Sequence, residues 1–86
     1  MKIWKFSLGK IITDEVITVA MPKGATILHV RSQRDVPCIW ALIDPNAETE
    51  MRQFYIAATG EATPKGQYLG TVFQYDGIYV WHVFEL

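Results

Sequence analysis

Most of the features that reveal a particular activity or compartment are absent from this sequence of 86 residues. It has one cysteine, Cys38, so an intramolecular disulfide is impossible, which fits a reducing cytoplasm. No apolar run approaches the ~20 residues that a membrane helix needs. The first ten residues, MKIWKFSLGK, lack the long apolar stretch of a signal peptide. We therefore expect a single domain spanning residues 1–86, with no membrane contact.

A strong net charge is also lacking, because eight basic and nine acidic residues nearly cancel. A chain with this balance does not carry the basic surface expected of a protein that binds duplex nucleic acid. A small basic pocket remains compatible with it. The low net charge also weakens the long-range repulsion that opposes self-association.

Catalytic, metal-binding and phosphate-binding motifs are missing as well. The only two histidines, His29 and His82, form no zinc-ligand spacing with Cys38. The six glycines are scattered, and none opens a glycine-rich phosphate loop. Ser7 and Ser32 lack a G-x-S-x-G context, and Cys38 lies in an apolar run where a thiol is usually an inert core group. We predict a protein that is not an enzyme and needs neither a cofactor nor a metal.

What the sequence does contain is apolar residues at a period of two, which is the period of β-strands. Half of the residues are apolar and 13% are aromatic, which is enough for a folded core. The strands predicted from this pattern cover residues 2–8, 15–20, 25–33, 37–43, 51–58, 68–75 and 78–84. We predict an all-β domain of six or seven mostly antiparallel strands, arranged as a small β-sandwich or a partly open barrel.

Two of the predicted strands, 37–43 and 78–84, are apolar on both faces, which is typical of strands covered on both sides. In the second of them, His82 is expected to be half-buried with its ring nitrogens hydrogen-bonded. Asp76-Gly77 predicts a hairpin between 68–75 and 78–84, because both central positions of a type I′ turn need a positive φ. We expect most of the tryptophans and phenylalanines to lie in the core.

Two segments carry more detailed expectations. In the strand at 25–33, simple alternation places Ile27 and His29 on one face and Leu28 and Val30 on the other. Residues 47–53, AETEMRQ, are ambiguous. The i,i+4 spacing of an acidic and a basic residue there suits one helical turn, whereas a loop that leads into the next strand fits equally.

Several blocks together resemble a family of small proteins found in tailed phages and prophages. The blocks are KIWKF at 2–6, MPKGATILHV at 21–30, PCIWALIDP at 37–45, LGTVF at 69–73 and VWHVFE at 80–85. The resemblance covers most of the chain, and its blocks are structural in character. It implies a viral origin, and with it a location in the host cytoplasm.

The resemblance favours three functions. The first is a non-enzymatic accessory protein that binds a host protein, as an inhibitor of a host defence system. The second is a sponge for a small anionic ligand that resembles a nucleotide. The third is a structural or assembly component of the virion.

The candidate contact residues are two arginines and three aromatic residues. Arg31 and Arg34 lie near a strand end, where paired guanidinium groups could hold an anion or a phosphodiester. The alternative is that these charges are solvated and protect a strand edge. Tyr55, Tyr79 and Trp81 suit an aromatic interface, although tyrosines are also ordinary on a half-exposed sheet.

We also expect a homodimer. A core this small is often supplemented by oligomerisation when disulfides and metals are absent. A two-fold dimer is the default symmetry, with one self-complementary patch. The sequence places that patch around Tyr55, Tyr79 and Trp81.

Overall fold

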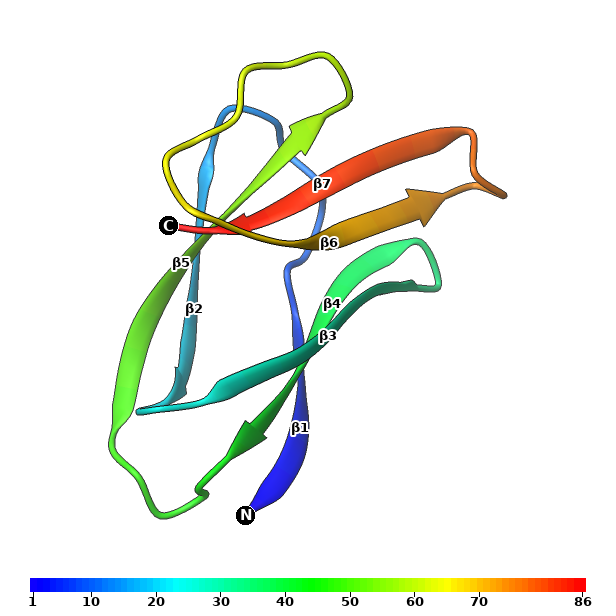
Figure 1. The fold of residues 1–86 in the computed structure, drawn as a ribbon. Helices are drawn as coiled ribbons and strands as arrows, with labels where there is room; N and C mark the ends of the chain where they lie inside the picture. The colour runs from blue at the N-terminus through cyan, green and yellow to red at the C-terminus, as the bar shows by residue number, and fades with distance from the viewer.

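The computed structural model describes residues 1–86 and contains seven strands and no helix. The strands are β1 (Lys2–Ser7), β2 (Val16–Pro22), β3 (Thr26–Gln33), β4 (Val36–Ile43), β5 (Thr49–Ala58), β6 (Gln67–Gln74) and β7 (Tyr79–Glu85). They form a three-stranded sheet, β1-β4-β3, and a four-stranded sheet, β2-β5-β7-β6 (Figure 1). Every paired strand is antiparallel. The all-β prediction is confirmed, as a small sandwich that is not closed into a barrel. No helix of the length and apolarity needed to cross a membrane is present.

Two tight hairpins lie next to each other in this sandwich. The β3–β4 turn has positive φ at both central residues, Arg34 (51°) and Asp35 (63°), as a type I′ turn requires. The β6–β7 hairpin is also confirmed, but its positive φ values begin one residue earlier than predicted. They occur at Tyr75 (50°), Asp76 (56°) and Gly77 (85°). The β3–β4 turn is therefore a two-residue turn, whereas the β6–β7 turn has four residues, 75–78, between the paired Gln74 and Tyr79.

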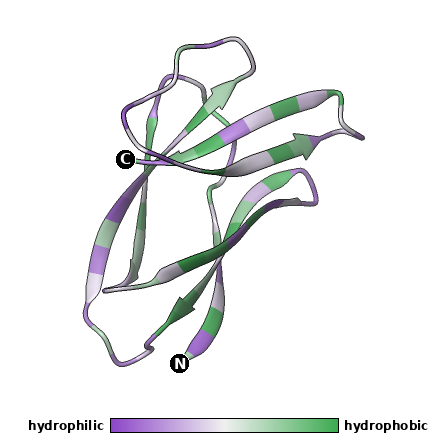
Figure 2. Cartoon of the chain, viewed as in Figure 1, coloured by the Kyte–Doolittle hydropathy of each residue, from purple (hydrophilic) through white to green (hydrophobic).

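The core lies between the two sheets and consists mainly of aliphatic side chains. Its buried members are Leu8, Met21, Ala25, Val30, Ile39, Ala41, Ile43, Phe54, Ile56, Val72 and Val83. Figure 2 shows hydrophobic residues interspersed with hydrophilic ones along β5 and β7, and the strand register directs Phe54, Ile56 and Val83 toward this layer. The expectation that most tryptophans and phenylalanines are core residues holds only in part. Phe54 and Phe84 are buried, and Phe6 and Trp81 are partly buried and pack against the core, whereas Trp4 and Phe73 are exposed.

Strand β3 departs from simple alternation. Its pairing with β4 shifts register between Ile27 and His29, which is the signature of a β-bulge. The extra residue, Leu28, is half exposed, while Ile27 and Val30 both pack on the core. The predicted assignment of faces is therefore wrong at Ile27 and His29. Their alternation fails because a bulge inserts one residue that the partner strand does not match.

The ambiguous segment at 47–53 is not helical. A turn closes behind β4, where the backbone N–H of Ala47 donates to the Asp44 carbonyl at 3.1 Å. The Asp44 side chain supports it by accepting from the Asn46 backbone at 3.0 Å. Strand β5 then begins at Thr49, two residues earlier than predicted.

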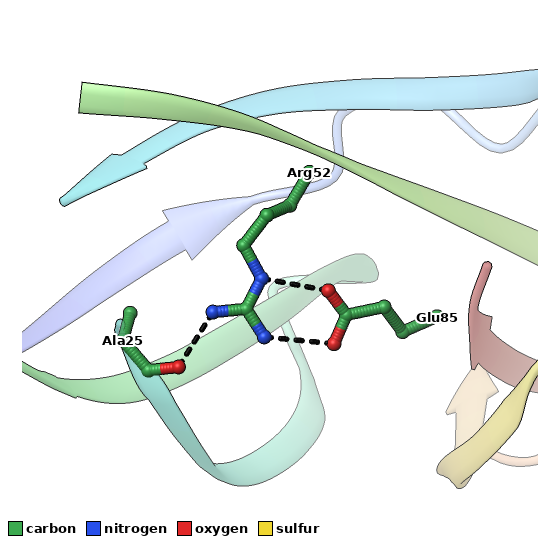
Figure 3. Close-up of polar contacts among 3 residues, drawn as sticks. All are labelled: Ala25, Arg52 and Glu85. Atoms are coloured by element: carbon green, nitrogen blue, oxygen red, sulfur yellow. Dashed lines mark hydrogen bonds and ion pairs between the residues drawn. The ribbon is translucent and has the colours of Figure 1, made fainter. Parts of the chain in front are cut away.

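Arg52, on β5, makes polar contacts with Glu85 on β7 and with Ala25 before β3 (Figure 3). Its guanidinium donates from Nε and Nη2 to the two carboxylate oxygens of Glu85, at 2.6 and 2.8 Å. Its Nη1 donates to the carbonyl of Ala25, just before β3, at 2.5 Å. The hydrogen bond to Glu85 raises the pKa of Arg52 above its ordinary value. This contact links β5 and β7 of one sheet to the entrance of β3 in the other.

Candidate functional site

The tips of the two hairpins are joined by hydrogen bonds that involve one turn residue, Asp35. Its carboxylate accepts from the backbone N–H of Tyr75 at 2.8 Å, and its carbonyl accepts from Gln74 Nε2 at 2.6 Å. Figure 1 shows the β3–β4 and β6–β7 turns reaching the same end of the molecule. Because these bonds cross between the sheets, the tips form one surface rather than two separate loops.

An aromatic ladder runs along the β6–β7 hairpin toward this end. Tyr75 packs edge-on against Tyr79 with ring centroids 5.8 Å apart, and Tyr79 stacks on Trp81 at 6.2 Å with an interplanar angle of 22°. The indole N–H of Trp81 donates to Gln74 Oε1 at 2.8 Å. Since Gln74 also donates to Asp35, the ladder is fixed to the neighbouring tip.

Large apolar side chains are exposed on this hairpin. We call Phe73, Tyr75, Ile78 and Tyr79 the hairpin-tip surface. Their exposed fractions are 56%, 55%, 74% and 49%. Isolated exposed apolar residues are ordinary, but these four lie within seven positions and form a cluster around the hairpin tip, with Phe73 on the outer face of the hairpin and Tyr79 on its inner face. The cluster stands on a turn that hydrogen bonds hold in place, so a partner would meet an ordered surface.

A groove of about 580 Å³ lies beside the hairpin-tip surface, between β3 and β6. Residues that line it include His29, Arg31, Ser32, Arg34 and Phe73. The strands approach closely near its end, where a Cβ placed on Gly70 would lie 3.5 Å from Val30 Cβ. The hydroxyl of Ser32 is buried and has no hydrogen-bond partner within the chain. The groove thus offers guanidinium donors and one free hydroxyl to a bound group.

Four of the five predicted contact residues meet at this end of the molecule. Arg31 and Arg34 line the groove, while Tyr79 and Trp81 form the ladder beside it. Tyr55 does not join them. Its register with Phe84 places it on the outer face of the four-stranded sheet, whereas Trp81 lies on the inner face. The predicted dimer patch of Tyr55, Tyr79 and Trp81 therefore does not lie on one face of the sheet.

Tyr55 has a different local role. Its hydroxyl donates to Asp14 Oδ1 at 3.1 Å, which connects β5 to the loop that precedes β2. That hydrogen bond is the largest cause that raises the pKa of the Tyr55 phenol above its ordinary value of 10.0. The hydrogen bond between Tyr55 and Asp14 therefore holds the loop before β2 against β5.

A second polar cluster surrounds His82 on the outer face of the four-stranded sheet. Its Nε2 lies 2.8 Å from Thr59 Oγ1, and its Nδ1 lies 3.0 Å from Thr71 Oγ1, which also contacts the Tyr68 hydroxyl. The prediction of a half-buried, hydrogen-bonded His82 is confirmed. Neither His29 nor His82 is hydrogen-bonded to a carboxylate, and no group of three potential metal ligands occurs. A histidine held between hydroxyls lacks the acidic partner that orients a general base.

Comparison with known proteins places the chain in a family. A model described as "Domain of unknown function (DUF7352)" matches residues 1–86. The chain belongs to this family. No curated protein and no solved structure shows significant similarity to it. The functional argument for this DUF7352 chain therefore depends on the surfaces described above.

Several surface residues of this DUF7352 chain escaped prediction. Phe73, predicted as a core residue with the other phenylalanines, faces outward on the same side as Val80. Tyr75 and Ile78 flank the Asp76-Gly77 signal, and residues next to a hairpin turn are commonly exposed. The position of Tyr75 and Ile78 next to this turn is the sequence feature that predicts their exposure. Trp40, predicted as a core residue, lies half-buried on the outer face of the three-stranded sheet.

Proposed function

We propose that this chain is a non-enzymatic accessory protein of phage origin that binds a host protein through the hairpin-tip surface. The observation that carries the proposal is the exposure of Phe73, Tyr75, Ile78 and Tyr79 around the tip of the β6–β7 hairpin, which hydrogen bonds join to the β3–β4 turn. Aromatic side chains are enriched among the residues that dominate protein–protein binding energy. Their exposure in the free chain is costly unless a partner covers them.

The expected partner has an apolar cleft with acidic residues at its rim. The aromatic cluster would enter the cleft, because large rigid side chains bury much area at little cost in conformational entropy. Arg31 and Arg34 lie beside the cluster, and neither takes part in a salt bridge within the chain. Both guanidinium groups therefore remain available to carboxylates of the partner.

The non-enzymatic part of the proposal rests on the chemistry of the groups present. The thiol of Cys38 is buried and lies 3.4 Å from the Val36 carbonyl. The His82 ring is occupied by Thr59 and Thr71. No nucleophile with an adjacent base and an orienting acid is available. The proposed effect is inhibition of a host defence protein by occupation of its surface, in the host cytoplasm.

The test is affinity capture from host lysate with matched variants. Wild type and Met51→Ala, which alters an exposed apolar residue far from the tips in the sequence, should retain the same host protein. Phe73→Ser and Tyr79→Ser should lose it while keeping the wild-type thermal transition. The activity of the captured protein should fall when purified wild-type chain is added.

Three results would contradict the proposal. Capture that survives both tip variants would place the contact elsewhere. Capture of no host protein by the wild type would remove the proposed partner. Recovery of the chain in purified virus particles, with no host protein bound, would favour a structural or assembly role.

A further inference from the structure

The outer face of the three-stranded sheet, of which the proposed function uses only Arg31 and Arg34, has an unusual distribution of charge. Side chains of β1, β3 and β4 that point away from the core include Lys5, His29 and Arg31. Arg34 follows in the turn between β3 and β4. None of the nine acidic residues occupies an outward position on these three strands. We call this surface, with Trp40 at its centre, the cationic face.

The near-neutral total charge conceals this segregation. Lys5, Arg31 and Arg34 are three of the eight basic residues, so five basic residues stand against all nine acidic residues elsewhere. Asp35 is next in sequence, but its carboxylate is held toward the other hairpin by the Tyr75 backbone. The only salt bridge in the chain is between Arg52 and Glu85. The cationic face therefore has no internal counter-charge.

Trp40 supplies an aromatic surface between these cations. The strand register places Lys5 on one side of it and His29 on the other. The His29 and Trp40 ring centroids are 6.1 Å apart, with an interplanar angle of 48°. Trp40 is half-buried, so part of its indole ring is open to solvent. It also lines a cleft of about 360 Å³ with Arg31, Gln33 and Arg34.

The spacing of this surface fits a base joined to phosphate. Arg31 is paired with Cys38, two positions along β4 from Trp40, which is about 7 Å along the strand. A second cleft, of about 510 Å³, continues past Cys38 and is lined by Lys5, Gln33 and Arg34. Lys5 Nζ donates to Gln33 Oε1 at 2.7 Å, which fixes one cation over this part of the sheet. Stacking at Trp40 and charge–charge contacts at the arginines can therefore act on one ligand.

We propose that the cationic face binds a ligand with a planar heteroaromatic base and phosphate, either a free nucleotide or single-stranded nucleic acid. The base stacks on Trp40, and Arg31, Arg34 and Lys5 hold the phosphates. The groove between β3 and β6 is less suited to this ligand, because Asp35 and Asp76 also line it. A duplex is not the ligand, because its bases are already stacked on one another.

The experiment measures fluorescence anisotropy of two labelled probes with the full chain, a nucleoside triphosphate and a single-stranded oligothymidine. Binding of the triphosphate alone identifies a nucleotide, and binding of the oligonucleotide alone or more tightly identifies single-stranded nucleic acid. Either result supports the proposal, provided that binding weakens as salt rises. Failure of both probes to bind overturns it. The proposal is also overturned if tripolyphosphate competes for the site as well as the nucleotide does. It is likewise overturned if duplex DNA binds as tightly as the single strand.

Variants locate the site. Trp40→Leu should weaken binding by about tenfold or more, through loss of stacking. Trp40 is partly buried, so the double variant Arg31→Gln with Arg34→Gln, which alters only exposed residues, provides a second measurement that does not depend on packing at Trp40. It should weaken binding about tenfold and flatten the salt dependence.

A matched pair distinguishes a defined site from general attraction between charges. Lys10→Gln with Lys23→Gln removes the same charge from exposed residues outside the cationic face and should leave affinity within about twofold. An equal loss in this control overturns the proposal. Phe73→Ser and Tyr79→Ser should leave probe binding unchanged, so failure of the hairpin-tip proposal would not affect this result.

Discussion

At the scale of single residues, Arg52 is the side chain whose contacts reach furthest across the fold. It bridges both oxygens of Glu85 and the carbonyl of Ala25, and the two charged side chains are 17% and 18% exposed. Arg52→Met should lower the free energy of unfolding by about 2 kcal/mol, because Glu85 is left partly buried without a partner. Arg52→Lys should cost about half as much, because one ammonium cannot make all three contacts. Urea denaturation measures both changes.

The comparison of Arg52→Met with Arg52→Lys has a defined control. Lys23→Met removes an exposed charge without a salt bridge and should change stability by less than about 0.5 kcal/mol. If Arg52→Met were no more destabilising than this control, the bridge would not contribute to stability.

Tyr55 gives a prediction on the alkaline side of the pH scale. Its hydrogen bond to Asp14 raises its folded-state pKa above the ordinary 10.0. The contact therefore contributes stability below pH 10 that is lost as pH rises through the folded-state pKa. Ultraviolet titration should show a tyrosine component displaced above the ordinary value, absent in Tyr55→Phe and shifted back in Asp14→Asn. A titration unchanged in both variants would exclude the contact.

At the scale of elements, the entrance to β6 depends on one glycine. A Cβ on Gly66 would collide with the carbonyl oxygen of Glu85 at the end of β7. Backbone cannot move aside as a flexible side chain can, so Gly66→Ala should cost about 1–3 kcal/mol. Gly70→Ala is the matched control, since its Cβ would meet only Val30 at 3.5 Å, an ordinary contact. It should be neutral or raise stability by about 0.5 kcal/mol. Thermal unfolding followed by circular dichroism compares them.

Strand β7 is the element on which the four-stranded sheet depends. It lies between β5 and β6, and it contributes Val83 and Phe84 to the buried interior. Deletion of residues 80–86 should abolish folding, because both neighbouring strands lose their pairing partner. Deletion of Leu86 alone, which is 43% exposed, should preserve a cooperative transition. A truncated chain that retained both this transition and the near-ultraviolet aromatic signal would contradict the expectation.

At the scale of the whole molecule, the unpaired edge strands of the sheets differ in how well they are protected against pairing with a strand of another chain. The edge strand β1 carries Lys2 and Lys5, and β3 carries Arg31, and such charges discourage pairing with another chain. The outer edge of β2, VITVAMP, has no charged residue and a proline only at its end. Together with the small core, this edge favours a homodimer in which two copies of β2 pair across a two-fold axis.

Light scattering after size exclusion, over a wide concentration range, should give about twice the chain mass of 9.8 kDa. Thr18→Lys, a charge on the exposed side of β2, should give the monomer mass without loss of fold. A mass of 9.8 kDa for the wild type at every concentration would exclude the dimer.

The sequence by itself determined the fold class, the strands and the hairpins. The period-two pattern marks strands because successive side chains point to opposite faces, and that property is local. Asp76-Gly77 likewise specified a hairpin, because residues that tolerate positive φ are needed there whatever surrounds them. The apolar 37–43 segment correctly predicted a central strand, β4, between β1 and β3.

Only the tertiary structure decided which residues share a surface. The bulge at Leu28 placed Ile27 and His29 on opposite faces, because an unmatched residue depends on the partner strand. The pairing of β5 with β7 separated Tyr55 from Trp81. The pairing of β3 with β4 brought Arg31 beside Cys38 and so near Trp40. Strand order and register arise from contacts between distant segments, so local patterns could name the candidate residues but not their neighbours.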